Sequence, residues 1–227
     1  MQIYLLRHGT TEWNSEHRIQ GHTDIPLDSI GLKMAEETGK ALHDMGIAFD
    51  LVYSSPLSRA TETARLVSRS ESIMTDNDLM ELSFGNFEGK LTTSMTDDPA
   101  SFFRYFKTDP VRYNEHIIKL GASDYESLDH LCERADHFLK EKMEPIVKDG
   151  SISKVLISGH GAINRALMLM MGRSRDLSSF WGSGLQPNCG IDVISCSYDS
   201  GIVIYDISQK SNIYYSSELM DSVIPLL

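Results

Sequence analysis

Cysteines and cationic residues are scarce in this sequence, and each shortage excludes a class of protein. Among 227 residues there are only 3 cysteines, and no two of them have the C-x-x-C spacing. This pattern predicts free thiols in a reducing compartment rather than a disulfide framework or a zinc site. Lys and Arg number 21 against 32 Asp and Glu, which gives a formal net charge of -11. Such a chain repels nucleic acid and anionic membranes, so an anion site must be built from a local cluster of cations.

Long apolar runs are missing as well. The longest run after the first strand, residues 166–171, is far shorter than the roughly 20 residues that span a bilayer. Residues 1–6 carry no basic leader, and their apolar run is too short for a signal peptide. We therefore expect a cytoplasmic protein with no membrane partner. No H-E-x-x-H or similar metal-ligand spacing occurs, and no internal repeat is visible.

Short apolar runs alternate with amphipathic segments along most of the chain. The predicted strands are 3–6, 49–53, 154–157, 191–196 and 202–207, and the predicted helices are 29–45, 55–68, 127–147 and 162–171. Ser55 and Pro56 have the order of an N-cap and a first helical residue. The alternation predicts a three-layer α/β/α fold around a mostly parallel sheet, as one domain over residues 1–227. Residues 83–123 have poor periodicity and predict a small cap excursion over the site.

Polar side chains follow three of the predicted strands directly. Arg-His-Gly occupies residues 7–9, Ser-Ser-Pro-Leu-Ser-Arg residues 54–59, and Ser-Gly-His-Gly residues 158–161. Because parallel strands end at the same edge of a sheet, we expect these segments to converge there. Two guanidinium groups, two imidazoles and a helix N-terminus would then meet, and guanidinium groups donate bidentately to phosphate oxygens. The sequence therefore predicts a site for a tightly bound dianion.

Four ordered blocks give the chain a resemblance to a known family. They read L-R-H-G-x-T-x-x-N at 6–14, S-S-P-L-x-R-A-x-x-T-A at 54–64, E-L-x-F-G-x-x-E-G at 81–89 and S-G-H-G at 158–161. In this order they resemble the histidine phosphatase superfamily, in the branch that includes cofactor-dependent phosphoglycerate mutases and their phosphatase relatives. The resemblance fades between about residues 92 and 125 and beyond about residue 197.

The resemblance implies a role for single residues of these blocks. His8 matches the nucleophile that becomes a phosphohistidine, and Glu81 matches the acid that protonates the leaving oxygen and then assists water. The positions that match phosphate-binding residues are Arg7, His8, Asn14, Arg59, His160 and Gly161. Phosphoryl transfer depends on positioning and charge stabilisation, which cations and fixed donors supply, so we expect no metal cofactor. His8 must be unprotonated to attack, and Glu81 must be protonated to donate, which requires burial or a neighbouring phosphate.

Structural readings of some of these residues stay open. Asn14 could cap a helix, and Glu88, in the same block as Glu81, could anchor its loop instead of acting as the acid. His22 follows the first block closely and could also reach the site. The aromatic side chains of residues 83–123 could form an apolar lid for a larger leaving group, or pack that segment onto the core. They are Phe84, Phe87, Phe102, Phe103, Tyr105, Phe106 and Tyr113.

One departure from the family pattern bears on the reaction. Leu82 and Ser83 follow Glu81, where true mutases carry a basic and aromatic run, and their longer basic insertion is absent. We therefore expect a metal-independent phosphatase that hydrolyses a small phosphorylated metabolite and releases inorganic phosphate. The alternative is a phosphoglycerate mutase, with missing cations supplied from residues 83–123. The candidate cations are Lys90, Arg104, Lys107 and Arg112. A non-catalytic phospho-ligand-binding module is less favoured, because it needs no nucleophile and acid together.

Overall fold

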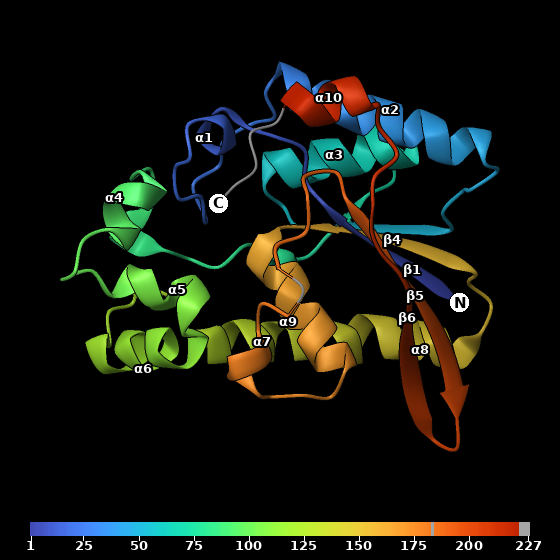
Figure 1. Ribbon diagram of the computed structural model, residues 1–227. Coiled ribbons are helices and arrows are strands. Elements are labelled where there is room, and N and C mark those ends of the chain that lie inside the picture. The colour runs from blue at the N-terminus through green and yellow to red at the C-terminus, as the bar shows by residue number, and fades with distance from the viewer. Residues whose placement is uncertain (183, 223–227) are drawn as a thin grey trace.

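A mixed sheet organises the chain, which the computed structural model describes for residues 1–182 and 184–222 (Figure 1). Within those residues the strands pair in the order β3-β2-β4-β1-β5-β6. They are β1 (Gln2–Arg7), β2 (Leu51–Ser54), β3 (Met74–Thr75), β4 (Lys154–Gly159), β5 (Ile191–Asp199) and β6 (Ile202–Asn212). Strands β3, β2, β4 and β1 are parallel, whereas β5 pairs antiparallel with β1 and β6 antiparallel with β5. The predicted mostly parallel α/β sheet is confirmed.

Helices cover both faces of this sheet (Figure 1). Those in the described residues are α1 (Glu12–Ser15), α2 (Ser29–Asp44), α3 (Ser58–Ser68), α4 (Thr92–Thr96), α5 (Tyr105–Thr108), α6 (Pro110–Leu120), α7 (Leu128–Phe138), α8 (Glu144–Asp149), α9 (Gly161–Met171) and α10 (Ser217–Ser222). Helices α2, α3 and α10 lie over one face, and α7, α8 and α9 lie over the other. The three-layer prediction is therefore confirmed. None of the helices in this part of the chain has the length and apolar character needed to cross a membrane.

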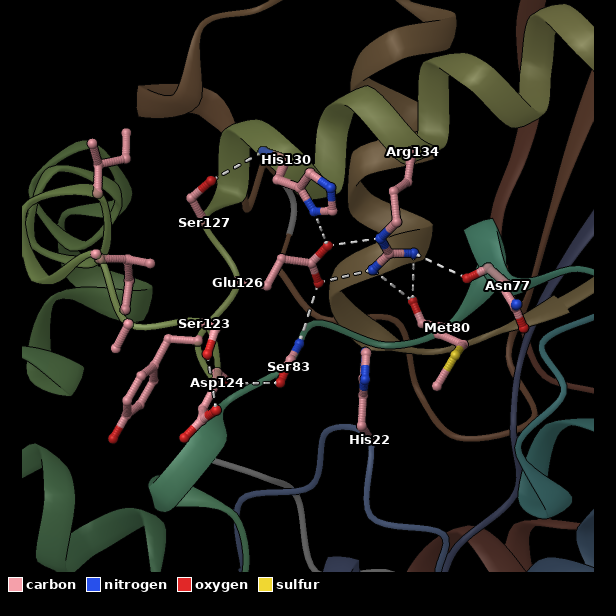
Figure 2. A pocket seen from close by; sticks show the side chains of 15 residues that line it. His22, Asn77, Met80, Ser83, Ser123, Asp124, Glu126, Ser127, His130 and Arg134 are labelled. Carbon is pink, nitrogen blue, oxygen red and sulfur yellow. Dashed lines mark hydrogen bonds and ion pairs between the residues drawn. The ribbon is translucent and has the colours of Figure 1, made fainter.

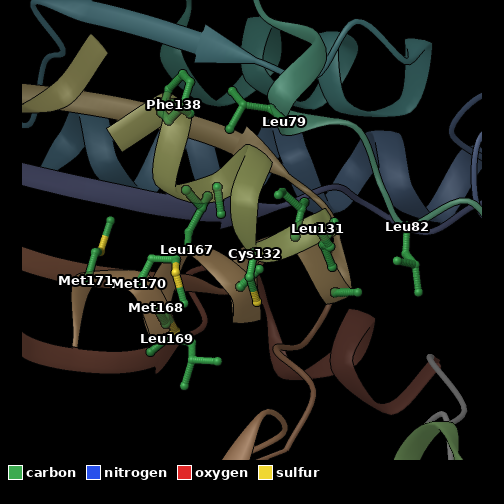
Figure 3. Close-up of a cluster of buried hydrophobic side chains, with 14 of the residues drawn as sticks. Leu79, Leu82, Leu131, Cys132, Phe138, Leu167, Met168, Leu169, Met170 and Met171 are labelled. Carbon is green, nitrogen blue, oxygen red and sulfur yellow. The ribbon is translucent and has the colours of Figure 1, made fainter. Parts of the chain in front are cut away.

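Burial on both faces explains the continuous apolar run of β1. Successive strand residues point to opposite faces. Ile3 and Leu5 enter the cluster beneath α7 and α9, shown in part in Figure 3, whereas Tyr4 and Leu6 enter the cluster beneath α2 and α3. The three cysteines are all buried and free, as their spacing predicted. Burial raises the pKa of each thiol, so all three stay protonated and pack as apolar side chains of the core.

Two predicted helices differ from the structure at their ends. The helix predicted from Ser55 begins at Ser58 with Leu57 as its N-cap, so the prediction of a Ser55 cap is wrong. Ser55 Oγ instead accepts the Leu57 N–H at 3.3 Å inside the preceding turn. The helix predicted over 127–147 is α7 and α8 joined by a π-helical turn, Leu139–Met143. Pro145, which lacks an N–H, lies in the first turn of α8, where an α-helix cannot continue unbroken.

The segment 83–123 contains short helices whose aromatic side chains pack against one another. Phe106 lies 5.0 Å from Phe84 between ring centroids, and also 5.0 Å from both Tyr113 and Trp181. The Trp181 Nε1–H donates to the Phe106 carbonyl oxygen at 2.6 Å. Five of the seven aromatic side chains in the segment are buried, and the other two, Phe102 and Tyr105, are partly buried against the same cluster. These contacts favour packing over an open apolar lid.

Candidate active site

The carboxyl ends of β1, β2 and β4 meet at one edge of the sheet. Arg7 lies opposite Gly159 in the β1–β4 register, and Ser54 lies opposite Ser158 in the β2–β4 register. The residues that follow these strands therefore come together. The His8 and His160 rings are 5.0 Å apart between centroids, and both side chains are buried.

His8 is held in one tautomer. Its side chain is 4 % exposed, and Nδ1 lies 2.6 Å from the Gly9 carbonyl oxygen. Because a carbonyl oxygen can only accept, Nδ1–H donates, and Nε2 of the neutral ring carries the lone pair. Burial, followed by the charges of Arg59 and Arg7, lowers the pKa of His8 well below 6.5. His8 is therefore neutral at pH 7, with Nε2 able to act as a nucleophile.

His160 is held in the opposite tautomer. Arg59 Nε–H donates to His160 Nδ1 at 3.2 Å, so the ring proton is on Nε2, which donates to Ser55 Oγ at 2.8 Å. Burial and then the Arg59 charge lower the pKa of His160 well below 6.5. Both ring nitrogens thus have protein partners. The Nε2–H can reach a phosphoryl oxygen only by exchanging Ser55 for it.

Two buried arginines face the histidines. Arg59 is fully buried, and its Nη1 and Nη2 donate to the carbonyl oxygens of Thr23 at 3.0 Å and Gly21 at 2.7 Å. Arg7 Nη1 donates to the Gln186 carbonyl oxygen at 2.6 Å, but the buried Nε has no hydrogen-bond partner among the described residues. Burial lowers the pKa of each arginine to about 10, so both stay charged at pH 7. A buried guanidinium donor without a protein partner is what an anion site requires.

Glu81 lies at the N-terminus of α9. Its carboxylate accepts the backbone N–H groups of Ala162 at 3.0 Å, Ile163 at 3.1 Å and Leu82 at 2.9 Å. Gly161 must be small at this point, because a Cβ would lie 2.7 Å from a Leu185 methyl carbon and 3.5 Å from Glu81 Oε2. These amides of α9 are therefore used by a carboxylate of the protein.

The predicted helix N-terminus at this edge is that of α3, and its first backbone amide is not free for a ligand. The Ser58 N–H and hydroxyl both donate to Asp24 Oδ1 at 2.8 Å. Asp24 thus satisfies the amide that a ligand would have needed. The cationic character of the site comes from Arg7 and Arg59 instead.

The loop that carries His8 rests directly on the main chain of α2. A Cβ on Gly31 would lie 2.2 Å from the Thr10 carbonyl oxygen, and a Cβ on Gly9 would lie 2.7 Å from the Gly31 carbonyl oxygen. Asp28, the N-cap of α2, accepts from Gly31 N and from Thr10 Oγ1, both at 2.7 Å. Only glycine at both positions allows this approach of the two backbones.

Two of the open structural readings are answered by hydrogen bonds. Asn14 Oδ1 accepts the Thr11 N–H at 3.2 Å, which completes a capping box at α1, so the capping reading of Asn14 is confirmed. Its contact with a phosphoryl group stays a prediction. Glu88 accepts the N–H groups of His22, Thr23 and Phe84 at 2.8–3.1 Å, which confirms it as a loop anchor. Burial raises the pKa of Glu88, but these hydrogen bonds have the larger combined effect and hold the pKa below its ordinary value.

Three further residues at this edge were not predicted from the sequence. Asn164 Nδ2 donates to the Leu6 carbonyl oxygen at 3.1 Å and to Gln186 Oε1 at 2.8 Å. Asn188 Nδ2 donates to the His8 carbonyl oxygen at 3.0 Å. They lie outside the four motif blocks. The one available signal was Asn164, which with Arg165 is one of two polar side chains in the otherwise apolar helix α9.

The four candidate cations of residues 83–123 divide into two groups. Arg104 and Arg112 lie over the Tyr105 ring, and Lys90 lies over the Phe87 ring, with the cation 4.0–5.5 Å from the ring centroid. Burial, followed by the charge of Arg7, lowers the pKa of Lys107. Among the described residues, no group of three or more His, Cys, Asp or Glu side chains gathers as a metal centre would require.

The buried histidines predict how folding stability depends on pH. An unfolded histidine titrates near 6.5, whereas His8 and His160 resist protonation in the folded state. Stability is therefore complete above pH 6.5 and is lost below it, by about 1.4 kcal/mol per pH unit for each proton taken up on unfolding. Exposed His137, whose pKa is raised by its hydrogen bond to Asp78, acts in the opposite direction.

Urea unfolding between about pH 6.5 and 5 measures this loss, above the range in which carboxylates titrate. In His8→Gln the free energy of unfolding should fall less steeply with decreasing pH, because only His160 still takes up a proton on unfolding. A free energy of unfolding that stays flat over this range would show that the two histidines are not buried in their neutral form.

Comparisons with known proteins show which family and which solved structures the chain is similar to. The family model for the histidine phosphatase superfamily (branch 1) matches residues 3–205. A probable 2-carboxy-D-arabinitol-1-phosphatase of Arabidopsis thaliana is 30% identical over 197 residues, which are 85% of this chain but only 37% of that protein. An uncharacterized phosphatase of Bacillus subtilis (strain 168), PhoE, is 31% identical over 168 residues, 73% of this chain and 75% of that one. The phosphoglycerate mutase structure from Bacillus anthracis str. Sterne superposes with a TM-score of 0.76 at 28% identity, covering 94% of this chain and 93% of that chain.

Proposed function

The chain belongs to the histidine phosphatase superfamily (branch 1), and we propose that it is a metal-independent phosphatase acting through a phosphohistidine on His8. The observation that carries this proposal is the state of His8. Its Nδ1–H is bonded to Gly9 and its Nε2 lone pair is available. Burial, assisted by the charges of Arg59 and Arg7, lowers the pKa of the ring and keeps it neutral. The substrate is a small phosphomonoester, and inorganic phosphate is the second product. We place the reaction in the cytoplasm.

The first step transfers the phosphoryl group to His8. Nε2 attacks phosphorus in line with the ester oxygen, so an N–P bond forms while the P–O bond breaks. Arg7 Nε and Arg59 neutralise the phosphoryl oxygens, with Asn14 and Gly161 N–H as further donors and His160 contributing after it exchanges Ser55. Fixed cations of this kind stabilise a charge-dispersed transition state without reorganisation.

Glu81 handles the proton in both steps. A bound phosphate dianion beside this carboxylate favours its protonated form, and the protonated acid supplies the proton to the leaving alkoxide. In the second step Glu81 accepts a proton from water as the water oxygen attacks phosphorus and the N–P bond breaks. Phosphate then leaves, and His8 returns to its neutral tautomer. The sum is hydrolysis of the ester by one water molecule.

Hydrolysis is favoured over mutase activity by the cations of residues 83–123, a segment that in this proposal covers the site and selects the leaving group. A mutase must hold a sugar-acid while the phosphoryl group returns to it. Arg104 and Arg112 lie on the Tyr105 ring rather than being free for such an acid. Mutase activity stays the second candidate, because Lys107 is a further cation of this segment.

Phosphate release from a panel of phosphomonoesters tests the proposal. The panel includes 3-phosphoglycerate, excess EDTA is present, and interconversion of the phosphoglycerates is followed in the same tubes. We expect phosphate release that EDTA does not reduce, with little interconversion. Interconversion without release would establish the mutase instead, and activity that EDTA abolishes would overturn metal independence. A folded protein that binds phosphate but has neither activity would be a binding module.

A further inference from the structure

The carbonyl oxygen of Glu81 accepts hydrogen bonds from two side chains outside the proposed machinery. His22 Nε2–H donates to it at 2.8 Å, and Arg134 Nη2 donates to it at 3.3 Å. His22 comes from the loop after α1, and Arg134 comes from α7. The peptide that follows Glu81 is therefore oriented by donors from two separate parts of the fold.

Arg134 contacts the chain on the N-terminal side of Glu81 as well. Its Nη1 donates to the carbonyl oxygens of Asp78 at 2.7 Å and Met80 at 3.1 Å, and Nη2 also donates to Met80. Figure 2 shows the contacts with Met80 and a longer one, of 3.5 Å, from Nη1 to the Asn77 carbonyl oxygen. The guanidinium group is fixed by Glu126, which accepts Nε–H at 2.7 Å and Nη2–H at 2.9 Å. The arginine side chain is 13% exposed and the glutamate side chain 8%, so this ion pair is largely shielded from water.

Glu126 extends the same network past Glu81. Its Oε2 accepts the Ser83 N–H at 3.2 Å, and its own backbone N–H donates to the Ser83 carbonyl oxygen at 3.0 Å. The Arg134–Glu126 pair thus binds main-chain atoms from residue 77 to residue 83, with Glu81 between the contacts.

Apolar packing alone does not orient Glu81. Leu79 and Leu82 are fully buried in the core cluster of Figure 3, which fixes the depth of the segment. Next to that segment is a cavity of about 630 Å³, lined in part by Met80, Ser83 and Arg134. Side chains facing a cavity lack the close packing that restricts movement elsewhere in the interior. The rotation of the Glu81 peptide is therefore set by its hydrogen bonds.

We propose that Arg134, fixed by Glu126 and assisted by His22, is a positioning residue that aims the Glu81 carboxyl group at the leaving oxygen of the substrate. The inference rests on the proposed function, in which Glu81 is the acid. Arg134 has no role in binding the phosphoryl group. Its loss should therefore reduce proton transfer to the leaving group and spare the attack by His8.

Leaving-group dependence separates positioning from a structural role. Glycerol 2-phosphate expels an alkoxide that needs a proton, whereas 2,4-dinitrophenyl phosphate expels a stable phenolate that needs none. For Arg134→Met we expect kcat/KM to fall about 10–100-fold with the alkyl ester, part of the 10²–10⁴-fold that general acid catalysis supplies, and less than about 3-fold with the aryl ester. Arg134→Lys should recover part of the alkyl activity, because an ammonium group retains a donor.

Matched variants guard against loss of folding. Arg173→Met removes another arginine that binds a backbone carbonyl, that of Val203, far from Glu81 in the chain, and should affect both esters alike. Thermal unfolding is recorded for each variant. If Arg134→Met does not fold, Arg134→Lys and His22→Ala carry the test, since exposed His22 contributes the second donor.

The outcomes are distinguishable. Equal losses with both esters, or no loss with the alkyl ester, would overturn the positioning role while leaving the proposed function intact. A wild-type protein inactive toward both esters, or a fully active His8→Ala variant, would overturn the proposed function and this inference with it.

Discussion

His8→Ala is expected to abolish phosphoryl transfer, with turnover reduced by about 10⁴-fold or more, the scale on which enzymes lose activity without their nucleophile. The reason is that His160, the other buried imidazole of the site, has no free lone pair. Both nitrogens of His160 are engaged, by Arg59 and by Ser55. Rapid quenching with a ³²P-labelled ester should trap a phosphoenzyme in the wild type, stable in alkali and labile in acid as an N–P bond is, and none in His8→Ala.

The matched control for this variant is His43→Ala. His43 is an exposed histidine in the last turn of α2, and it should leave both labelling and turnover unchanged. Removing the His8 ring also removes its bond to Gly9, so the thermal unfolding of both variants is compared. A phosphoenzyme that persists in folded His8→Ala would show that a different residue is the nucleophile.

The second large effect is expected from Glu81→Gln. The amide matches the carboxylate in size but can neither donate nor accept the proton. We expect kcat/KM for glycerol 2-phosphate to fall about 10²–10³-fold, within the range for general acid–base catalysis, and to fall much less for 2,4-dinitrophenyl phosphate.

A structural effect of Glu81→Gln can be separated from the catalytic one. In the native site Oε1 accepts from Leu82, Ala162 and Ile163, and Oε2 accepts from Ala162 again. An amide keeps the first set through its oxygen but loses the acceptor at Oε2, so a modest fall in stability is expected. Glu88→Gln, which weakens the loop anchor, should lower stability with no leaving-group dependence. Equal losses on both esters for Glu81→Gln would contradict the acid role.

Elements with a clear apolar pattern were predicted from the sequence within two or three residues. The predicted run 3–6 is β1, 154–157 is β4, 29–45 is α2 and 162–171 is α9. Helix α6 was missed because its buried side chains, Pro110, Tyr113, Asn114 and Ile117, mix polar and aromatic types. Its N-cap Asp109 accepts the Arg112 N–H at 3.1 Å, and that local signal lay in a segment read as irregular. The π-helical turn at residues 139–143 was also missed, because the sequence pattern does not show how the helix accommodates Pro145.

The candidate site was predictable where side chains carry the chemistry and not where side chains bind the main chain. Arg7, His8, Arg59 and His160 follow strands that the apolar pattern locates. The contacts of Arg134 with residues 78–81 and of Asn188 with His8 all end on carbonyl oxygens. Every residue has a carbonyl oxygen, so the acceptor of such a hydrogen bond cannot be recognised from the sequence. The displaced cap at Ser55 has the same origin, since its hydroxyl is used by His160 and Leu57.

The contact between Gly9 and Gly31 has a mechanical consequence. Side chains that separate two elements can change rotamer and absorb a displacement, but here backbone meets backbone with no such layer between. A shift of α2 along its axis is therefore transmitted to Thr10 and to the imidazole beside it. We therefore expect the loop that carries the nucleophile and the first turn of α2 to move together, so that a displacement of this helix changes the position of His8.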